Sequence, residues 1–169
     1  MTQTLPRDAR QPRRLRRWPL LLLLLALSYA VAAVGGLASS DAASTYRSLD
    51  RPAWAPPSWL FGPVWTVLYA TIAVSAWLVL RRRPLAEARA ETGAWSAQLA
   101  LNLAWTPLFF GAGQYGLAFL DICLLLAAIG TTMVLFRRSS RAAWLLLVPY
   151  ALWVLYAASL NFAIWQLNG

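Results

Sequence analysis

The sequence predicts an all-α membrane protein whose five transmembrane helices form a bundle, with the N-terminus in the cytoplasm and the C-terminus outside. Three observations predict this fold class: the composition, the long uncharged stretches and the placement of the arginines. Of the 169 residues, 60% are hydrophobic and 12% are charged, whereas soluble domains average about 45–50% apolar and 25% charged residues. The uncharged stretches suit membrane-crossing helices, which need about 20 residues each.

The expected helices are separated by charged or glycine-rich connections. The first helix contains six consecutive leucines, and the glycine-rich break 111–116 divides the third helix from the fourth. We expect a basic cytoplasmic tail over residues 1–17, a membrane domain over 18–169 with a Pro/Trp-rich loop over 41–62, and spans at about 19–38, 61–80, 93–111, 116–136 and 142–167. A cleaved signal peptide is the alternative for the first span, but its apolar run is longer than is usual for a signal.

The arginines orient the bundle. All 15 basic residues are arginine, and all except Arg47 and Arg51 lie in the N-terminal tail, the second connection or the fourth connection. Cytoplasmic connections carry the excess of basic residues, so these segments indicate a cytoplasmic N-terminus and an integral multi-pass membrane protein. The net charge of +9 therefore reflects membrane orientation, and no nucleic-acid partner is expected because the arginines lie in short clusters between apolar runs.

Two residue counts limit the possible chemistry. The chain has no histidine and one cysteine, Cys123, so it cannot by itself form a His/Cys zinc site, a Cys–His nucleophile pair, a histidine-ligated haem or an internal disulfide. We expect no metal site and interpret Cys123 as a small packing residue. Asp121, the only acid inside a predicted span, lies close enough to a helix start for partial hydration, which favours a structural role over a functional one.

The third predicted helix has a polar face. Gln98, Asn102 and Trp105 are spaced i, i+4 and i+7, which places them on one side of a helix. An amide that faced lipid would lack hydrogen-bond partners, so this side points into the bundle. Interhelical hydrogen bonding and pocket lining are both open interpretations.

The fifth predicted helix also has residues of interest on one face, with a small residue between two larger ones. Trp153, Ala157 and Asn161 recur every four residues and share a face. A ring, a small residue and an amide in succession form a wall that suits a flat aromatic ligand. The same pattern also serves close helix packing.

The loop over 41–62 ends in a segment dense in tryptophan and proline. Residues 54–65 include three of each, with the tryptophans at Trp54, Trp59 and Trp65. Indole rings prefer the membrane interface, so the segment is either an aromatic anchor or a stiff lid over the outer end of the bundle. Arg51, on the same side, is a candidate for a two-pronged contact with a ligand carboxylate, with a solvated loop charge as the alternative.

Four separated segments resemble the translocator protein family, which includes the TspO/MBR tryptophan-rich sensory proteins and the peripheral-type benzodiazepine receptors. The matching residues are Leu49-Asp50-Arg51-Pro52-Ala53-Trp54-Ala55-Pro56-Pro57-Ser58-Trp59, then Phe61-Gly62-Pro63-Val64-Trp65-Thr66 with Leu68-Tyr69, then Gln98-Leu99-Ala100-Leu101-Asn102 with Trp105, Pro107, Phe109 and Phe110, and finally Pro149-Tyr150 with Trp153 and Leu160-Asn161. The resemblance covers roughly residues 18–168 and identifies the chain as a bacterial member.

The resemblance implies a five-helix bundle, often a homodimer, whose first outer loop caps a pocket for tetrapyrroles, sterols and synthetic aromatic ligands. It implies protoporphyrin IX or haem as a ligand and no covalent cofactor. In the family, residues at the positions of Trp65 and Trp153 face the ligand, and the residue at the position of Ala157 lies beside it. The expected ligand-binding residues are Trp54, Trp59, Trp65, Asn102, Trp105, Leu117, Trp153, Ala157, Leu160 and Asn161, with Arg51 as a carboxylate contact.

One departure concerns sterols. Animal members carry a cholesterol motif of the pattern Leu-x-Tyr-x-x-x-Arg, whereas this chain has Leu160, Phe162 and Gln166 at the three positions. The hydroxyl and the charge are both lost, and such motifs are weak even when intact. Sterol binding at this segment is therefore not expected, and a sterol or lipid elsewhere in the pocket stays an open possibility.

Three functions fit these observations. The first is a membrane receptor or sensor that binds tetrapyrroles by ring stacking and burial, with free-base porphyrin bound at least as well as haem because no histidine can ligate iron. The second is a transporter of porphyrins or sterols, although no inverted repeats are visible. The third, implied by the resemblance, is light-dependent porphyrin degradation at Trp65 and Trp153.

Overall fold

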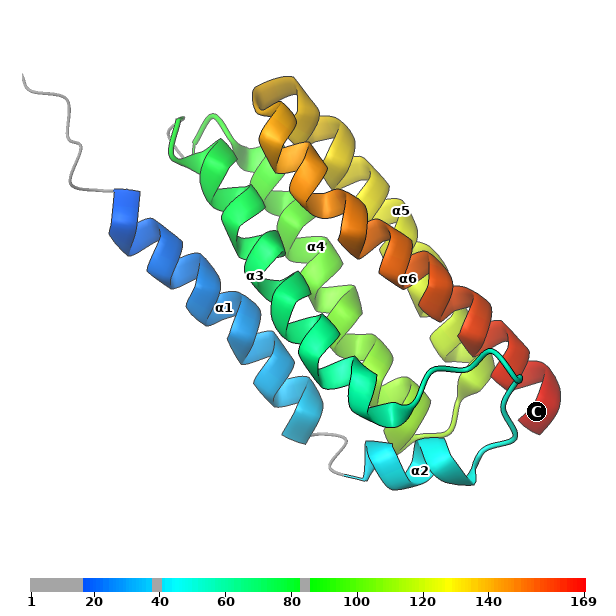
Figure 1. Cartoon of the computed structure of the whole chain (residues 1–169). Coiled ribbons are helices and arrows are strands. Elements are labelled where there is room, and N and C mark those ends of the chain that lie inside the picture. The colour runs from blue at the N-terminus through cyan, green and yellow to red at the C-terminus, as the bar shows by residue number, and fades with distance from the viewer. Residues whose placement is uncertain (1–16, 38–40, 83–85) are drawn as a thin grey trace, which may run out of the picture.

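A computed structural model describes residues 17–37, 41–82 and 86–169. This part of the chain forms six α-helices: α1 (Arg17–Leu37), α2 (Ala42–Ser48), α3 (Phe61–Leu80), α4 (Arg89–Thr106), α5 (Tyr115–Ser139) and α6 (Arg141–Asn168). A 3-10 turn, η2 (Ser58–Leu60), precedes α3, and a π turn, η3 (Pro107–Gly111), extends α4. Five long helices lie side by side, and the short α2 lies across the end of the bundle where the chain ends (Figure 1). The predicted basic tail lies outside the described residues up to residue 16.

The protein is an all-helical membrane protein. Within the described residues, four helical segments are long and apolar enough to cross a membrane: Trp18–Leu37, Ser58–Leu80, Tyr115–Ser139 and Arg141–Asn168. Helix α4 falls short of that criterion because its sequence includes Arg89, Glu91, Gln98 and Asn102. The last three of these side chains are nevertheless buried inside the bundle, so the polar groups of α4 lower its hydropathy without facing lipid.

Two segments differ from the boundaries expected from the sequence. Helix α4 begins at Arg89, four residues before the expected span, because its first turn is polar and no hydrophobicity pattern would include it. Part of the expected loop over 41–62 is helical, since Ala42–Ser48 form α2. The Ser44 hydroxyl donates to the Asp41 carbonyl at the start of this short helix.

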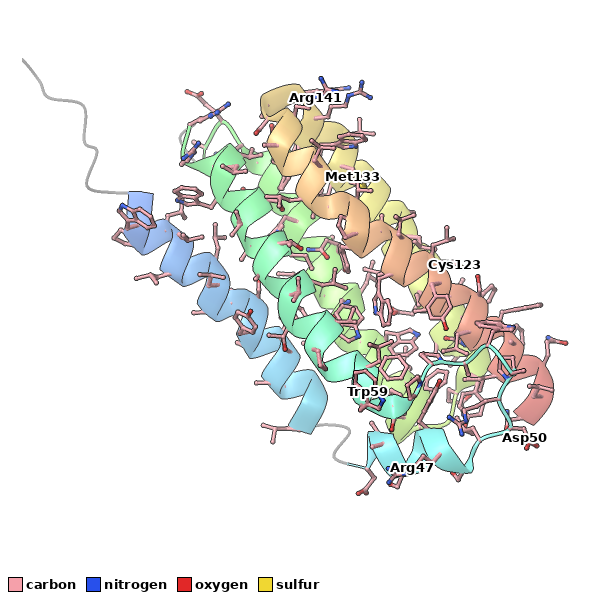
Figure 2. All side chains as sticks on the ribbon, in the orientation of Figure 1. Arg47, Asp50, Trp59, Cys123, Met133 and Arg141 are labelled. Atoms are coloured by element: carbon pink, nitrogen blue, oxygen red, sulfur yellow. The ribbon has the colours of Figure 1, made fainter. Side chains whose placement is uncertain are left out.

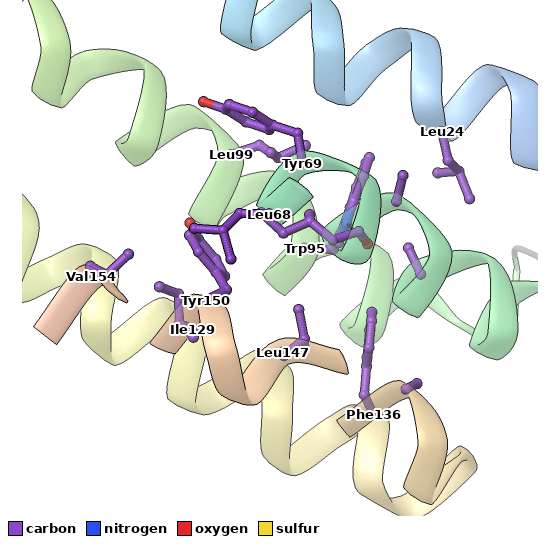
Figure 3. Packing of buried hydrophobic residues seen from close by; sticks show 14 of the residues in the cluster. Leu24, Leu68, Tyr69, Trp95, Leu99, Ile129, Phe136, Leu147, Tyr150 and Val154 are labelled. Carbon is purple, nitrogen blue, oxygen red and sulfur yellow. Dashed lines mark hydrogen bonds between the residues drawn. The ribbon is translucent and has the colours of Figure 1, made fainter. Parts of the chain in front are cut away.

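The helices pack in a closed arrangement around an apolar core. Helix α3 packs against α1 and α6, and α4 packs against α5 and α1, while α5 packs against α6. Figure 3 shows core side chains contributed by all five long helices, among them Leu24, Leu68, Trp95, Ile129 and Leu147. Small residues bring the helices together, since Ala73, Ala76 and Ala143 are fully buried.

The segment between α2 and α3 is fastened to the end of α6. The side chain of Asn168 accepts a hydrogen bond from the Asp50 amide at 3.0 Å and donates one to the Asp50 carbonyl at 2.9 Å. The Tyr156 hydroxyl donates to the Trp54 carbonyl at 3.0 Å, and the Tyr46 hydroxyl donates to the Pro56 carbonyl at 2.9 Å. These bonds hold the proline-rich segment across the same end of the bundle as α2.

Candidate functional site

A cavity of about 400 Å³ lies at the α2 end of the bundle. All six helices contribute to its wall, which is mostly apolar and rich in aromatic rings. Figure 2 shows Arg47, Asp50 and Trp59 at this end of the molecule and Arg141 at the opposite end. The volume is within the range of about 300–1,000 Å³ that is typical of small-molecule sites.

Most of the residues expected to bind a ligand line this cavity. They are Trp65 of α3, Asn102 and Trp105 of α4, and Trp153, Ala157, Leu160 and Asn161 of α6. Spacings of three and four residues place these side chains on the inner faces of their helices, and the tertiary structure turns the three faces toward one space. Interhelical hydrogen bonding and pocket lining, the two interpretations of the α4 face, both apply to Asn102, which lines the cavity and also bonds to another helix.

Hydrogen bonds position the outer polar part of the wall. Trp105 Nε1 donates to Asn161 Oδ1 at 3.0 Å, and Asn161 Nδ2 donates to the Tyr115 carbonyl at 2.9 Å. The Trp105 ring also stacks on Phe109 with centroids 4.9 Å apart. The amide of Asn161 is therefore committed to α4 and α5, and it presents the Trp105 ring in a fixed orientation.

A second group of hydrogen bonds connects α3, α4 and α6 at the inner end of the cavity, away from α2. The Tyr69 hydroxyl donates to Asn102 Oδ1, and Asn102 Nδ2 donates to the Tyr150 hydroxyl at 3.4 Å. The Tyr150 hydroxyl donates to Gln98 Oε1 at 2.7 Å, and Gln98 Nε2 donates to the Trp95 carbonyl at 3.0 Å. Tyr69 and Asn102 line the cavity, whereas Gln98 and Tyr150 are fully buried outside it.

A buried polar atom in the cavity wall lacks a partner. Trp153 Nε1 is buried and makes no hydrogen bond within the part of the chain that the structure describes. Its ring packs edge-on against Phe61, with centroids 6.1 Å apart, and against Tyr156 at 5.7 Å. An unpaired buried donor costs free energy, so Trp153 is suited to donate to an acceptor atom of a bound molecule.

Three expected residues lie away from the cavity wall. Trp54 is half exposed and meets the Tyr156 ring edge-on at 5.7 Å. Trp59 is 70% exposed in the turn before α3, where its neighbours Ser58 and Phe61 line the cavity instead. Leu117 is 55% exposed on the outer side of α5, which lines the cavity through Ile122 and Leu125.

Arg51 lies next to the cavity without lining it. Its guanidinium is 4.7 Å from the centroid of the Tyr46 ring, and Tyr46 is part of the wall. Burial raises the pKa of the Tyr46 hydroxyl above its usual value, and the Arg51 guanidinium opposes that rise. Arg51 is exposed, so its charge is available at the mouth of the site.

Two expectations for single residues in α5 are wrong. Asp121 is only 8% exposed, and its Oδ2 atom is buried without a partner among the described residues, so the expected partial hydration is absent, whereas its structural role stays a prediction. Cys123 is exposed on the outer side of the bundle and does not pack inside it. Neither residue lines the cavity.

Several wall residues were not expected from the sequence. They include Tyr46, Phe61, Tyr69, Phe109, Gly35 and Gly36. The helical repeat could have found two of them, since Tyr69 follows Trp65 by four residues and Phe109 follows Trp105 by four. In α1 the signal is weaker, since the polar and fully buried Ser28 precedes Gly35 by seven residues, two turns along the same face.

Comparisons with known proteins extend this description. The TspO/MBR family model matches residues 22–166. The chain is 41% identical to the translocator protein of Ovis aries over 125 residues, which are 73% of this chain and 74% of that protein. It is 41% identical to the tryptophan-rich protein TspO of Chlorobaculum tepidum over 150 residues, 88% of this chain and 95% of the relative.

A third relative is the tryptophan-rich sensory protein of Cereibacter sphaeroides, which is 35% identical over 151 residues, 89% of this chain and 92% of that protein. The family-model match over residues 22–166 includes residues of all six helices that build the cavity. These matches agree with the resemblance seen in the loop and in the faces of α4 and α6. The chain is an integral multi-pass membrane protein and belongs to the TspO/MBR family, whose members include translocator proteins and tryptophan-rich sensory proteins.

Proposed function

We propose that this protein is a membrane receptor or sensor that binds tetrapyrroles, and other flat apolar ligands, in the cavity at the α2 end. The observation that carries the proposal is a cavity of about 400 Å³ whose wall includes the indoles of Trp65, Trp105 and Trp153. Aromatic side chains bind flat rings by stacking and by edge-to-face contact. The fastened segment between α2 and α3 covers the site.

Binding rests on ring burial and not on iron ligation. The chain has no histidine, so free-base protoporphyrin IX binds at least as well as haem. The propionates of either ligand stay at the mouth of the cavity, because charged groups are costly inside a membrane protein. Arg51 stands there beside Tyr46, in position to meet one carboxylate in a two-pronged contact.

We infer that all five long helices cross the membrane, with the N-terminus inside. Helix α4 lies alongside the neighbouring helices over a comparable length (Figure 1), and it buries Gln98 and Asn102 within the bundle. Two arginines directly after α3 and two in the last turn of α5 lie at one end, namely Arg81, Arg82, Arg137 and Arg138, whereas Arg47 and Arg51 lie at the other. The positive-inside rule assigns the first end to the cytoplasm.

Tryptophan-fluorescence quenching tests the proposed ligand. Purified protein in detergent is titrated with protoporphyrin IX and with haem, and Trp153→Ala is expected to weaken the binding of both about tenfold or more because it removes a wall of the cavity. Trp144→Ala is the matched control, since Trp144 packs under Arg137 at the opposite end of the bundle. Unchanged affinity in Trp153→Ala, or equal losses in the two variants, would contradict the assignment.

A second candidate function is light-dependent degradation of the bound porphyrin. The observation in its favour is that Trp65 and Trp153, the two residues that would react, line the same cavity. Illumination of the complex would then bleach the porphyrin absorbance in the wild type and not in Trp65→Phe or Trp153→Phe. Equal bleaching in all three proteins would leave ligand binding as the function of the site.

A further inference from the structure

We propose that Tyr150 and Gln98, which lie outside the cavity, hold the Tyr69 hydroxyl as a hydrogen-bond acceptor at the inner end of the cavity, so that the site prefers ligands with a donor group on their buried edge. The inference rests on the proposed function and adds a rule of ligand selection to it. It follows from the direction of each hydrogen bond in the group that connects α3, α4 and α6.

The hydrogen bond between Gln98 and the Trp95 carbonyl cannot be reversed, and it fixes the direction of every other bond in the group. A backbone carbonyl only accepts hydrogen bonds, so the Gln98 side-chain atom that lies 3.0 Å from the Trp95 carbonyl must be the amide nitrogen. The opposite orientation of the amide would place two oxygen atoms against each other. Gln98 Oε1 therefore points away from Trp95 and accepts the bond from Tyr150 at 2.7 Å.

This constraint passes from residue to residue. A tyrosine hydroxyl has one hydrogen, and Tyr150 gives its hydrogen to Gln98. The Tyr150 oxygen can then only accept from Asn102, whose Nδ2 lies 3.4 Å away. Asn102 must accordingly present Oδ1 to Tyr69, and Tyr69 donates to it. The single hydrogen of the Tyr69 hydroxyl is committed, and the hydroxyl oxygen has only lone pairs left to offer.

Tyr69 and Asn102 occupy the innermost part of the cavity. Along α3 the wall runs from Phe61 through Trp65 to Tyr69, and along α4 it runs from Phe110 to Asn102. A ligand whose carboxylates stay at the mouth directs the opposite edge of its ring toward these two residues. A hydroxyl or N–H group on that edge can donate to the Tyr69 oxygen, whereas a carbonyl oxygen there meets the Tyr69 lone pairs and gains no hydrogen bond from that hydroxyl.

The two residues that set the direction of the hydrogen bonds do not contact the ligand. Tyr150 and Gln98 are 0% and 1% exposed and do not line the cavity, so neither residue contacts the ligand directly. Trp153 Nε1 has no partner among the described residues, and Asn102 Nδ2 has a second hydrogen besides the one given to Tyr150. Both donors bond equally to a hydroxyl oxygen and a carbonyl oxygen. Their contribution therefore cancels when the two kinds of ligand are compared, and the preference comes from Tyr69.

A matched pair of porphyrins measures that preference. One is deuteroporphyrin IX with 1-hydroxyethyl groups on the edge opposite its propionates, and the other carries acetyl groups at the same positions. Fluorescence quenching of the full-length protein gives the ratio of the two dissociation constants. The wild type is expected to favour the hydroxyethyl compound about tenfold, which is the effect of one well-placed hydrogen bond that the acetyl compound does not receive from Tyr69.

Two variants outside the cavity are expected to abolish the ratio. Tyr150→Phe removes the bond that holds the Asn102 amide, so the amide can turn over. In Gln98→Leu the Tyr150 hydroxyl loses its acceptor and donates to Asn102 instead, which reverses the direction of the hydrogen bonds from Tyr150 to Tyr69. In both variants Tyr69 can donate to an acetyl group, and the ratio falls to about one. Tyr29→Phe is the matched control, because it removes a tyrosine hydroxyl that donates to the Thr66 carbonyl and is not part of the group connecting α3, α4 and α6, and it keeps the tenfold ratio.

The outcomes separate this inference from the proposed function. A wild-type ratio near one overturns the inference and leaves porphyrin binding intact, and a tenfold ratio that persists in both variants overturns the role of Tyr150 and Gln98. Failure of the wild type to bind either porphyrin overturns both proposals. If Tyr150 and Gln98 had a merely structural role, their substitution would weaken the binding of both porphyrins together and leave the ratio of the dissociation constants unchanged. Tyr69→Phe removes the acceptor itself and is a third variant with an expected ratio near one.

Discussion

The two ends of the bundle are built from the same helices and differ in how they are filled. At the arginine-rich end, Phe136, Val79, Ala76 and Ala143 are completely buried in a continuous core. At the α2 end, the same helices enclose a cavity walled by tryptophan and tyrosine rings. Small residues at the first end let the helices approach closely, whereas large rings stand around the second end and leave space between them. Stability and ligand binding are thereby placed in different parts of one fold.

The largest effect is expected from a cavity introduced at the packed end. Phe136→Ala removes a fully buried ring and is expected to lower the free energy of unfolding by about 3–5 kcal/mol. Phe110→Ala is the matched change at the other end, where the ring already borders open space, and it costs less than half as much. Unfolding in detergent by SDS titration measures both, and equal losses would mean that the two ends are packed alike.

An added side chain separates the two ends in a second way. Ala76→Leu overfills the core and is expected to destabilise the protein by about 1–3 kcal/mol. Ala157→Leu extends into the cavity, so it leaves stability nearly unchanged and weakens porphyrin binding about tenfold or more, because the recess is lost. Thermal unfolding and ligand titration of both variants check the pair; a large loss of stability in Ala157→Leu would show that the recess is a packing contact.

A smaller effect on the free energy of unfolding is expected from removing the hydrogen bond that the Trp105 indole donates from α4 to α6. Trp105→Phe keeps a ring in the wall and removes the donor to Asn161 Oδ1. The buried amide oxygen is left unpaired, which costs about 1–3 kcal/mol. Trp165→Phe serves as the control, since Trp165 lies on the outer side of α6. The prediction is contradicted when both substitutions change the unfolding free energy by the same amount.

The smallest effect on affinity is expected where the loop is tied to α6. Asn168→Ala removes the two bonds to the Asp50 backbone, so the covering segment opens more often and both association and dissociation of the ligand become faster. The dissociation constant changes by less than about threefold, because the cavity wall is intact. Stopped-flow quenching measures the rates, with the exposed Gln166→Ala as control; unchanged rates in Asn168→Ala would show that ligands reach the cavity by another route.

The periodicity of α4 and α6 was sufficient to predict most of the cavity wall. Asn102 with Trp105, and Trp153 with Ala157 and Asn161, share a face in any α-helix, and polar groups within a membrane turn inward. These inferences need only local geometry and the surrounding solvent. The same reasoning could have added Tyr69, four residues after Trp65.

The sequence by itself determined the five long helices, the uncharged spans, the distribution of arginines and the inner faces of α4 and α6, because each depends on residues near one another in the chain. Only the tertiary structure decided the rest. It placed Trp59 outside the wall, set Arg51 on the Tyr46 ring, and tied Asp50 to Asn168 across 118 residues. It also oriented the Tyr69 hydroxyl through Tyr150, which lies 48 residues from Asn102. Such contacts depend on where separate helices meet, and no local pattern encodes the direction of a hydrogen bond between them.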